Sequence, residues 1–567
     1  MTVTQMKGFP DDPIFRNIVR VAANSDRRII RDPGLGIEVG YRTFLSDVLR
    51  VRMKIQRQIP LLAGGNRDAH HDGIYIAIMA PSNYHQIVAF FAILAMGAVA
   101  VFIPTTISPE EGRDLIERCN STTILFGSEY RDWVNSACSK GLTGIKSILI
   151  PFEGPEGGLV DPITINPSLQ FTSTHPAMVQ FTSGSTGSPK GVVHPREFFY
   201  RQVEVYFGCS MEDANGLVHL LGEDALYLSF RAFWWSGGLR NMTAAILAGV
   251  CVEVQPHAPT PQGLWERLRK GDVAFLICQS FIWTRMKDYY DETLMGLPPT
   301  ERREYEDGVA RLRLAKNDSG VLTPLVRRFW SRLLGGQSIA VNYAATEMSI
   351  ALGKTNDPDE NTDERVIGKP LPGVQVKLSE NDQGEIRLKS PLLFQRYIRD
   401  PEATRAAFDE EGFYKTGDLG HKDGDNFVID GRVSTNVFRV CAYRVLTMEV
   451  EEVLASLPYV CEGYVLGVPD TRIVTRVAAL VRLRGTKTVN LETIREDMRS
   501  SLSPYKRPGL LRILGPDEQV PRTSSGKFDL PAAREKFFHQ KVEGSVESLP
   551  EGVEVLDLNM ILADCVL

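Results

Sequence analysis

One segment of the chain combines glycines, hydroxyl residues and a lysine, Phe181-Thr-Ser-Gly-Ser-Thr-Gly-Ser-Pro-Lys190-Gly191, after an apolar lead over 177–180. Glycine permits positive φ and close backbone approach, so successive N–H groups can point into one concavity. The hydroxyls add donors and Lys190 adds a fixed positive charge, which together suit a polyphosphate. A flexible Gly/Ser linker is the alternative, but such linkers rarely follow a buried strand and end in Pro-Lys-Gly. The segment is not a Walker A loop, because the Gly-Lys-Ser/Thr ending is absent.

The same segment resembles the phosphate loop of the adenylate-forming superfamily, which includes acyl-CoA synthetases, the adenylation domains of peptide synthetases, and luciferases. Four further motifs resemble those of the family and follow in its order: Tyr-Gly-x-Thr-Glu at 342–347, Thr-Gly-Asp at 414–419, Gly-Arg at 430–432, and the C-terminal lysine motif at 521–527. Any one motif is weak, whereas the ordered set over roughly residues 30–540 is a specific signal.

The resemblance implies an α/β fold with a large N-terminal domain of parallel-rich sheets flanked by helices, followed by a small α+β lid. We expect an adenylation domain over 1–431, which binds ATP and the acid, a mobile lid over 432–540, and a tail over 541–567. The resemblance also implies two half-reactions. A carboxylate first attacks the α-phosphate of ATP to give acyl-AMP and pyrophosphate, and a thiol then takes the acyl group and releases AMP.

Three residues are the candidates for catalysis. Two anions must meet in the first half-reaction, so a positive charge has to neutralise the charge that develops on phosphorus. The resemblance gives this role to Lys527, for which a solvated surface lysine is the alternative. Glu347 is the expected ligand of Mg²⁺, and Thr346 the expected donor to the α-phosphate. Thr346 and Glu347 would also suit the cap of a helix that starts at Met348.

The nucleotide needs further contacts beyond its phosphates. Asp418 can accept hydrogen bonds from both ribose hydroxyls, although an ordinary turn also explains Thr-Gly-Asp. Arg432 offers a planar fork of donors, and Tyr343 either stacks on adenine or packs in the core. The expected residues of the ATP/AMP site are Thr182, Ser183, Gly184, Ser185, Thr186, Gly187, Lys190, Tyr343, Thr346, Asp418, Arg432 and Lys527.

The acyl pocket is expected around 227–238, where the family often has Pro-x-Phe-His-x-x-Gly. Trp234 or Trp235 stands where histidine is usual, and Ala344 replaces a glycine. Large flat rings make an apolar wall, which favours a short, branched, aromatic or medium-chain acid. Core packing of one tryptophan remains an alternative, and in some family members a tryptophan here gates a tunnel for long chains.

Other positions also depart from the family pattern. Residues 317–320 (Asn-Asp-Ser-Gly) replace a Gly-Gly-Ala-Pro-like loop near adenine. Ser434 stands at the expected hinge, where Asp or Lys is usual. Ala442 replaces a glycine that in the family lies near the path of the pantetheine thiol, so we expect its methyl group to narrow that path. The second half-reaction is therefore less firmly indicated than the first.

The elements that position these motifs alternate between strand and helix patterns. Buried strands are expected over 74–79, 98–103, 147–150, 249–254 and 273–278, and helices over 83–96 and 109–119. After about residue 430, helices over 448–457 and 491–502 and strands over 464–468 and 477–484 predict an α+β unit. The apolar run over 87–103 reads as a helix closed by Gly97 and a strand ended by Pro104 rather than as a membrane span.

Composition excludes several classes of protein. The 567 residues are 43% hydrophobic and 24% charged with net charge −6, which argues against bulk disorder and against nucleic-acid binding. The eight cysteines form no CxxC pair, so free thiols are expected. The N-terminus lacks a signal-peptide pattern and the C-terminus is not Ser-Lys-Leu, so we expect a cytoplasmic protein without a membrane span, as a monomer or homodimer.

These observations favour an ATP-dependent ligase that uses Mg²⁺ to activate a small-molecule carboxylic acid and transfers the acyl group to CoA. A stand-alone adenylating enzyme that loads the pantetheine of a carrier protein in trans is an alternative hypothesis. A non-catalytic nucleotide-binding relative is a third, and it is disfavoured because Lys190, Glu347, Asp418, Arg432 and Lys527 occur together.

Overall fold

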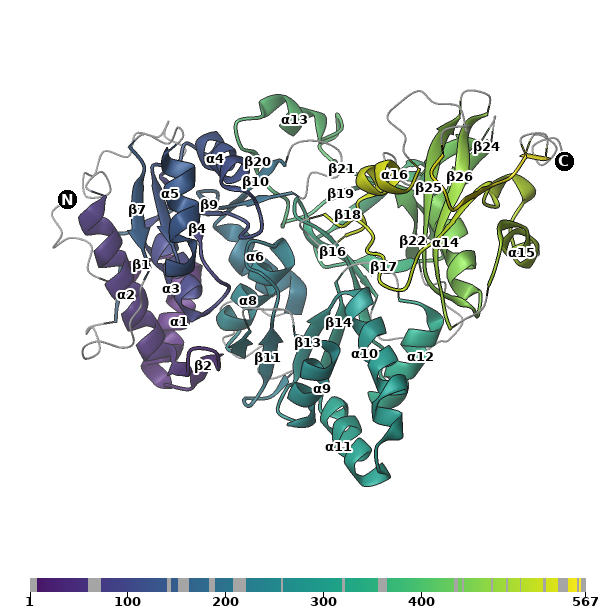
Figure 1. Cartoon of the computed structure of the whole chain (residues 1–567). Coiled ribbons are helices and arrows are strands. Elements are labelled where there is room, and N and C mark those ends of the chain that lie inside the picture. The colour runs from purple at the N-terminus through teal and green to yellow at the C-terminus, as the bar shows by residue number, and fades with distance from the viewer. Residues whose placement is uncertain are drawn as a thin grey trace. The chain divides into compact units, whose positions relative to one another are not determined.

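The computed structural model describes residues 8–59, 73–139, 144–150, 163–182, 189–207, 221–255, 259–318, 322–354, 365–432, 437–440, 443–470, 473–485, 488–499, 501–523, 527–538, 549–557 and 560–561. The chain divides into two compact units (Figure 1). The first contains the described residues of 1–182, 189–376 and 388–414, and the second those of 377–387 and 415–567. The domain boundary expected at 431/432 and the mobility of a lid stay predictions.

One sheet of the first unit is mostly parallel, as strand–helix alternation predicts. Its order is β20 (Arg396–Tyr397), β10 (Gly191–Pro195), β9 (Pro176–Phe181), β5 (Val99–Phe102), β4 (Tyr75–Met79), β6 (Thr123–Phe126) and β7 (Lys146–Leu149). The pairs from β9 to β7 are parallel, whereas β10 pairs antiparallel with β9 and with β20. The β9–β10 connection carries the glycine-rich segment.

A second sheet of this unit has the order β17 (Val366–Pro370), β16 (Ser349–Lys354), β15 (Ala340–Ala345), β14 (Leu314–Asn317), β13 (Phe275–Cys278), β11 (Leu226–Ser229), β12 (Cys251–Val254), β2 (Arg28–Asp32) and β3 (Ile37–Gly40). The strands from β15 to β2 are parallel. A parallel pair also joins β1 (Phe9–Pro10) to β8 (Ile165–Asn166). The carboxyl ends of β11, β13, β14 and β15 therefore meet at one edge, where ligands of parallel sheets bind.

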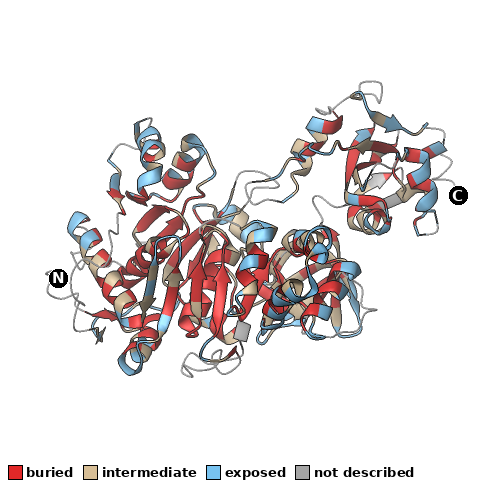
Figure 2. Cartoon of the chain, turned by 60° about the horizontal axis from the view of Figure 1, so that its bottom comes forward, coloured by how far each residue is buried: buried red, intermediate tan, exposed pale blue. Residues whose placement is uncertain are grey.

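Helices cover these sheets. They are α1 (Pro13–Asn24), α2 (Tyr41–Gln58), α3 (Tyr84–Met96), α4 (Pro109–Arg118), α5 (Arg131–Ser139), α6 (Glu197–Phe207), α8 (Ser236–Leu247), α9 (Pro261–Arg269), α10 (Ser280–Glu292), α11 (Pro299–Ala310), α12 (Pro324–Leu333) and α13 (Pro401–Ala406), with 3₁₀ turns at Ser128–Tyr130 and Leu294–Gly296. In Figure 2 the strands of this unit are buried while its outer helices expose one face, the pattern of a layered α/β fold.

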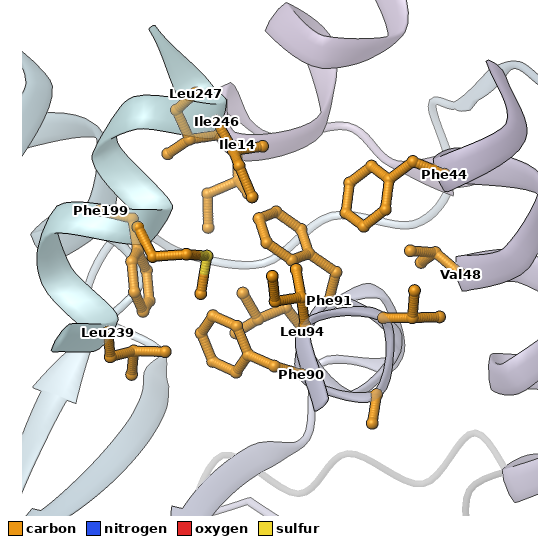
Figure 3. Packing of buried hydrophobic residues seen from close by; sticks show 14 of the residues in the cluster. Ile14, Phe44, Val48, Phe90, Phe91, Leu94, Phe199, Leu239, Ile246 and Leu247 are labelled. Carbon is orange, nitrogen blue, oxygen red and sulfur yellow. The ribbon is translucent and has the colours of Figure 1, made fainter. Parts of the chain in front are cut away.

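Helix α3 is the centre of the largest hydrophobic cluster. Apolar residues occupy every face of this helix, as expected for a helix that is buried on every side. Figure 3 shows its side chains directed at those of α1, α2, α6 and α8, among them Phe90, Phe91, Leu94, Ile14, Phe44, Val48, Phe199 and Leu239. As predicted, Gly97 closes the helix in the left-handed region at φ 71° and the buried strand β5 follows. No helix among the described residues is long and apolar enough to span a bilayer.

The second unit holds antiparallel sheets and short helices. Strands β18 (Gln375–Glu380), β19 (Gln383–Lys389), β21 (Tyr414–Asp423) and β22 (Asn426–Arg432) are neighbours in that order, and β23 (Val437–Val440) pairs with β24 (Tyr443–Leu446). A further sheet is formed by β25 (Val460–Asp470), β26 (Val474–Leu483), β27 (Leu510–Ile513) and β28 (Val553–Val555). Helices α14 (Thr447–Ser456), α15 (Leu491–Asp497) and α16 (Leu530–Phe538) and the 3₁₀ turn Pro504–Lys506 complete the unit.

Two details of the second unit differ from what the sequence indicates. The helix expected over 491–502 ends at Asp497, and turns with hydrogen bonds to the carbonyl of Met498 continue to the buried Leu502. The segment 541–567, expected only as an appended tail, supplies β28 and the buried side chain of Ile561. The described cysteines Cys119, Cys138, Cys251, Cys278 and Cys461 are free thiols, as expected.

Candidate active site

The two ends of the glycine-rich loop are hydrogen-bonded to each other. The backbone N–H of Thr182 donates to the carbonyl of Lys190 at 3.0 Å, and the N–H of Lys190 donates to Oγ1 of Thr182 at 3.1 Å. These bonds extend the β9–β10 pairing beyond Phe181 and hold the base of the loop. The loop residues Ser183, Gly184, Ser185, Thr186 and Gly187 lie outside the described part of the chain.

Lys190 and Glu347 contact the same aromatic residue, Tyr397 of β20. The ammonium of Lys190 lies 4.8 Å from the centre of the Tyr397 ring, a distance typical of a cation–π contact. The hydroxyl of Tyr397 donates to Oε1 of Glu347 at 3.0 Å. The structure thus brings together two residues that are 157 positions apart by their numbers, the loop lysine and the expected metal ligand. Tyr397 is the residue between them, and sequence reasoning missed it.

Burial and the Glu347 carboxylate keep the neighbouring phenols protonated. Tyr397 is 5% exposed, and burial followed by the charge of Glu347 raises its pKa above the usual value. The pKa of Tyr414 is raised well above its usual value by the same two causes, with further contributions from Tyr397. The two rings pack with Phe394 and Phe408 at centroid distances of 4.7 to 5.9 Å. Glu347 therefore has one protonated, closely packed donor beside it, the hydroxyl of Tyr397.

The Thr346–Glu347 turn joins β15 to β16, so the alternative of a helix starting at Met348 is wrong. Ser349 is already the first residue of β16, because the antiparallel pairing with β15 resumes there. Two hydrogen bonds hold the turn. Nε2 of His194 lies 2.8 Å from the carbonyl of Thr346, and the N–H of Phe394 donates to the carbonyl of Glu347 at 2.7 Å. The turn is thus held by its backbone, while the side chain of Glu347 accepts a hydrogen bond from Tyr397.

His194 is a neutral donor in this arrangement. It is fully buried on β10, and burial lowers its pKa to about 3; the hydrogen bond with the Thr346 carbonyl opposes this shift, and the charge of Arg240 adds to it. A neutral imidazole whose Nε2 faces a carbonyl oxygen carries its proton on that nitrogen. Sequence reasoning missed His194 as well, since a lone histidine in an apolar strand gives no motif.

Tyr343 and Ala344 lie at an irregularity of the β15–β16 pairing. The register shifts between these two residues, which turns the side chains that follow. Tyr343 is 7% exposed, so it packs largely within the unit, and its role toward adenine stays a prediction. Ala344 is partly buried next to it, and its place in an acyl pocket stays a prediction too.

Trp234 and Trp235 lie between β11 and α8. Their rings are perpendicular at 5.8 Å, and Trp235 is the N-cap residue of α8. Trp234 packs against the main hydrophobic cluster, which agrees with core packing for one ring. The guanidinium of Arg231 lies 5.2 Å from the ring of Trp235. Arg231 is itself buried and pairs with Asp318, a contact that no sequence motif indicated.

The second unit carries the remaining candidates. Asp418 lies in β21, is 5% exposed, and is paired across the sheet with Arg432. Its backbone N–H donates to Oγ1 of Thr416 at 3.0 Å. The side chain of Arg432 and the residues Ser434 and Ala442 lie outside the described part of the chain, so their expected roles stay predictions.

Lys527 is exposed on a short turn of the second unit. Its carbonyl accepts a hydrogen bond from the N–H of Thr523 at 2.8 Å. The next residue, Phe528, stacks on Tyr464 at 4.3 Å with an angle of 8° between the rings. The turn is therefore anchored to β25 while the lysine side chain meets solvent.

The residues of the first unit fit a magnesium ion that is held jointly with phosphates. The described residues include no group of three or more His, Cys, Asp or Glu side chains that would enclose a metal. Mg²⁺ needs no such cage, since one or two carboxylates, waters and substrate phosphates suffice. Glu347, fixed by Tyr397, is a carboxylate of this kind.

Comparison with known proteins gives the family. The profile described as "AMP-binding enzyme" matches residues 62–398, and that described as "AMP-binding enzyme C-terminal domain" matches 449–527. The chain belongs to the AMP-binding enzyme family. It is 33% identical to the acyl-CoA ligase oryP of Aspergillus oryzae over 98% of this chain and 97% of that protein. It is 26% identical to the human mitochondrial malonate–CoA ligase ACSF3 over 88% of each chain.

Solved structures show the same fold. ATP-bound MatB from Rhodopseudomonas palustris aligns with a TM-score of 0.75 at 20% identity, over 93% of this chain and 98% of that one. The o-succinylbenzoate CoA synthetase MenE of Bacillus subtilis, in complex with an acyl-adenylate, aligns with a TM-score of 0.72 at 19% identity over 93% of this chain and 99% of that one. The adenylate-forming fold predicted from the motifs is confirmed, and the protein is an AMP-forming acid–thiol ligase.

Proposed function

We propose that the protein joins a carboxylic acid to the thiol of CoA in two steps that consume ATP. A carboxylate oxygen attacks the α-phosphorus, the bond to pyrophosphate breaks, and acyl-AMP forms. The CoA sulfur then attacks the acyl carbon and AMP leaves. Relatives named as CoA ligases, matched over nearly the whole length of the chain, support CoA as the acceptor.

The observation that carries this proposal is the contact of both Lys190 and Glu347 with Tyr397. It puts a cation and a carboxylate at the base of the glycine-rich loop, the arrangement that a metal–polyphosphate complex requires. Glu347 would hold Mg²⁺, which when bound neutralises phosphate charge. Lys190 would bind the phosphates beyond it, and Thr346 would donate to the α-phosphate.

Residues of the second unit would complete the chemistry. Asp418 would accept from the ribose hydroxyls, Arg432 would contact the nucleotide, and Lys527 would neutralise the charge that develops at the α-phosphate. Trp234, Trp235 and Ala344 would line the acyl pocket. Ser434 would serve as hinge and Ala442 would border the path of the thiol.

A pyrophosphate-release assay with a panel of carboxylic acids, run with and without CoA, tests the proposal. We expect release that depends on both acid and Mg²⁺, and formation of the thioester when CoA is present. Adenylation without thioester formation on CoA would instead support a carrier-protein pantetheine as acceptor. Absence of pyrophosphate release with every acid of the panel would overturn the proposed reaction.

A further inference from the structure

Three charged side chains form a buried cluster at the carboxyl ends of β11 and β14. Nη1 of Arg231 lies 2.5 Å from Oδ2 of Asp318, and Nη2 of Arg240 lies 2.9 and 3.0 Å from the two carboxylate oxygens. Arg231 is 9% exposed, Arg240 2% and Asp318 8%. We call Arg231, Arg240 and Asp318 the arginine–aspartate cluster.

The cluster contains two positive charges and one negative charge, so one positive charge is not neutralised within it. Within the described residues, the ion pairs of Arg231 and Arg240 both go to Asp318. Burial raises the pKa of Asp318, but the charges of Arg240 and Arg231 outweigh burial and hold it below its usual value, so the carboxylate is ionised. A buried surplus charge is costly unless a counter-charge binds.

The surroundings add cationic and unpartnered donor groups. Burial lowers the pKa of the nearby Lys316 to about 7, with Asp318 opposing the shift and Arg240 adding to it. Among the described residues, Nε of Arg231, Nε of Arg240 and Oγ of Ser236, the first residue of α8, are buried without a hydrogen-bond partner. Buried polar groups are normally hydrogen-bonded, so these N–H and O–H groups are available to a polar group that binds beside the cluster.

The first turn of α8 lies against the cluster. A Cβ on Gly237 would come within 2.7 Å of Nη1 of Arg231 and of Oδ2 of Asp318, which explains the glycine. The N-cap residue Trp235 makes no side-chain hydrogen bond to the helix. The N–H groups at the start of a helix that lacks such a cap favour a negative charge.

The cluster belongs to the same edge of the first unit as the proposed chemistry. Arg240 acts electrostatically on His194, whose Nε2 holds the carbonyl of Thr346. Nε2 of Gln180 donates at 3.2 Å to the carbonyl of Phe233, so the segment before α8 is tied to the strand that enters the glycine-rich loop. In the parallel sheet, β14 is the immediate neighbour of β15, which carries Tyr343 and Ala344.

We propose that the arginine–aspartate cluster binds a second carboxylate on the acid substrate, so that the enzyme activates dicarboxylic acids in preference to monocarboxylic acids. One added carboxylate brings the cluster to neutrality, and planar guanidinium forks match carboxylate geometry. The inference rests on the proposed function and specifies its substrate class. One carboxylate of the substrate reacts with ATP, and the other is held at Arg231 and Arg240.

The wild-type enzyme with paired acids tests this directly. Pyrophosphate release is measured with malonate, succinate, glutarate and adipate, each against the monoacid of the same carbon number. For at least one chain length we expect kcat/KM to be higher for the diacid by about 100-fold or more, because a site built for a polar group rejects an analogue that leaves it unpaired. Equal or lower kcat/KM for the diacid at every length would overturn the inference.

Variants assign the preference to the cluster. Replacing either arginine, Arg231→Gln or Arg240→Gln, removes the surplus charge, so we expect the diacid-to-monoacid ratio of kcat/KM to fall by at least about tenfold. Arg267→Gln is the matched control. Arg267 lies on α9, is 7% exposed and pairs with two carboxylates, those of Glu253 and Asp272. This control should lower the melting temperature without changing the ratio. A fall of both acids in parallel in the arginine variants would assign the cluster a structural role and overturn the inference.

The two proposals fail in different ways. If no acid supports pyrophosphate release, the proposed function fails. If monoacids are adenylated as well as diacids, the proposed function stands and the dicarboxylate inference fails. If diacids are adenylated but CoA does not accept the acyl group, the inference stands and the acceptor changes.

Discussion

Tyr397 shows how a residue outside the recognisable motifs can organise those within them. Its ring contacts the Lys190 ammonium and its hydroxyl donates to Glu347. A hydrogen bond to a charged group typically contributes about 1.5–3 kcal/mol. Tyr397 is therefore a positioning residue, because it acts through the two side chains that would meet the nucleotide and the metal.

Tyr397→Phe keeps the ring beside Lys190 and removes only the hydroxyl. We expect the Mg²⁺ concentration needed for half-maximal pyrophosphate release to rise by about 10- to 100-fold, because Glu347 loses its donor. Tyr290→Phe is the control, since it removes a similar Tyr–Glu hydrogen bond, to Glu306, outside the site. An unchanged Mg²⁺ dependence of Tyr397→Phe would contradict this role.

His194 predicts a specific response of stability to acid. Its folded-state pKa of about 3 lies below the ordinary value of 6.5. As pH falls through 6.5 the unfolded chain gains this proton and the folded one does not, so stability is lost on acidification. The loss between pH 7 and pH 5 is about 2 kcal/mol for this group. We expect His194→Gln, which keeps a donor for Thr346, to show a smaller drop in melting temperature between these pH values, measured by circular dichroism. An identical drop in both proteins would show that His194 does not titrate in this way.

At the scale of elements, the turn from α3 into β5 is the sharpest local constraint. Gly97 has φ 71°, and a Cβ there would overlap the ring of Phe171. A left-handed conformation costs an ordinary residue about 1–2 kcal/mol, and a clash with a packed ring adds to that cost.

Gly97→Ala should therefore lower the free energy of unfolding by about 3 kcal/mol or more, measured by urea denaturation. Gly335→Ala is the matched control, because Gly335 has φ 65° with nothing within 4 Å of its added Cβ. In this control the free energy of unfolding should fall only by the cost of the left-handed backbone conformation, about 1 kcal/mol. Equal losses in the two variants would show that contact with Phe171 contributes nothing.

At the scale of the whole molecule, the chain carries its candidate nucleotide residues on two compact units. Lys190, Thr346 and Glu347 belong to the first, and Asp418 and Lys527 to the second. Because Lys527 is exposed on an anchored turn, its replacement should leave the fold intact.

We expect Lys527→Ala to reduce acid-dependent pyrophosphate release by about 1,000-fold or more, because the charge that develops at the α-phosphate during attack would lose the cation proposed to neutralise it. Asp418→Ala should instead raise the KM for ATP by about tenfold or more, through lost ribose contacts. Near-normal adenylation by Lys527→Ala would remove this lysine from the mechanism. An unchanged KM for ATP in Asp418→Ala would contradict the ribose role.

The sequence alone determined the fold class, the family and most of the local elements. Local signals in the sequence predicted helix α3, its end at Gly97 and the strand β5. These signals are the apolar run, a glycine suited to the left-handed conformation and the proline that follows the strand. The glycine-rich segment and the other motifs could be recognised for the same reason, because each is a short contiguous sequence pattern.

Only the tertiary structure decided which side chains meet across the chain. Tyr397, His194 and the Arg231–Asp318–Arg240 cluster belong to no motif, because each acts through a contact with residues 50 or more positions away. The turn at Thr346–Glu347, where a helix was an alternative, follows from strand pairing that lies beyond any local window. Contacts of this range depend on the packing of whole elements, and that packing is set by the buried core rather than by neighbouring residues in the sequence.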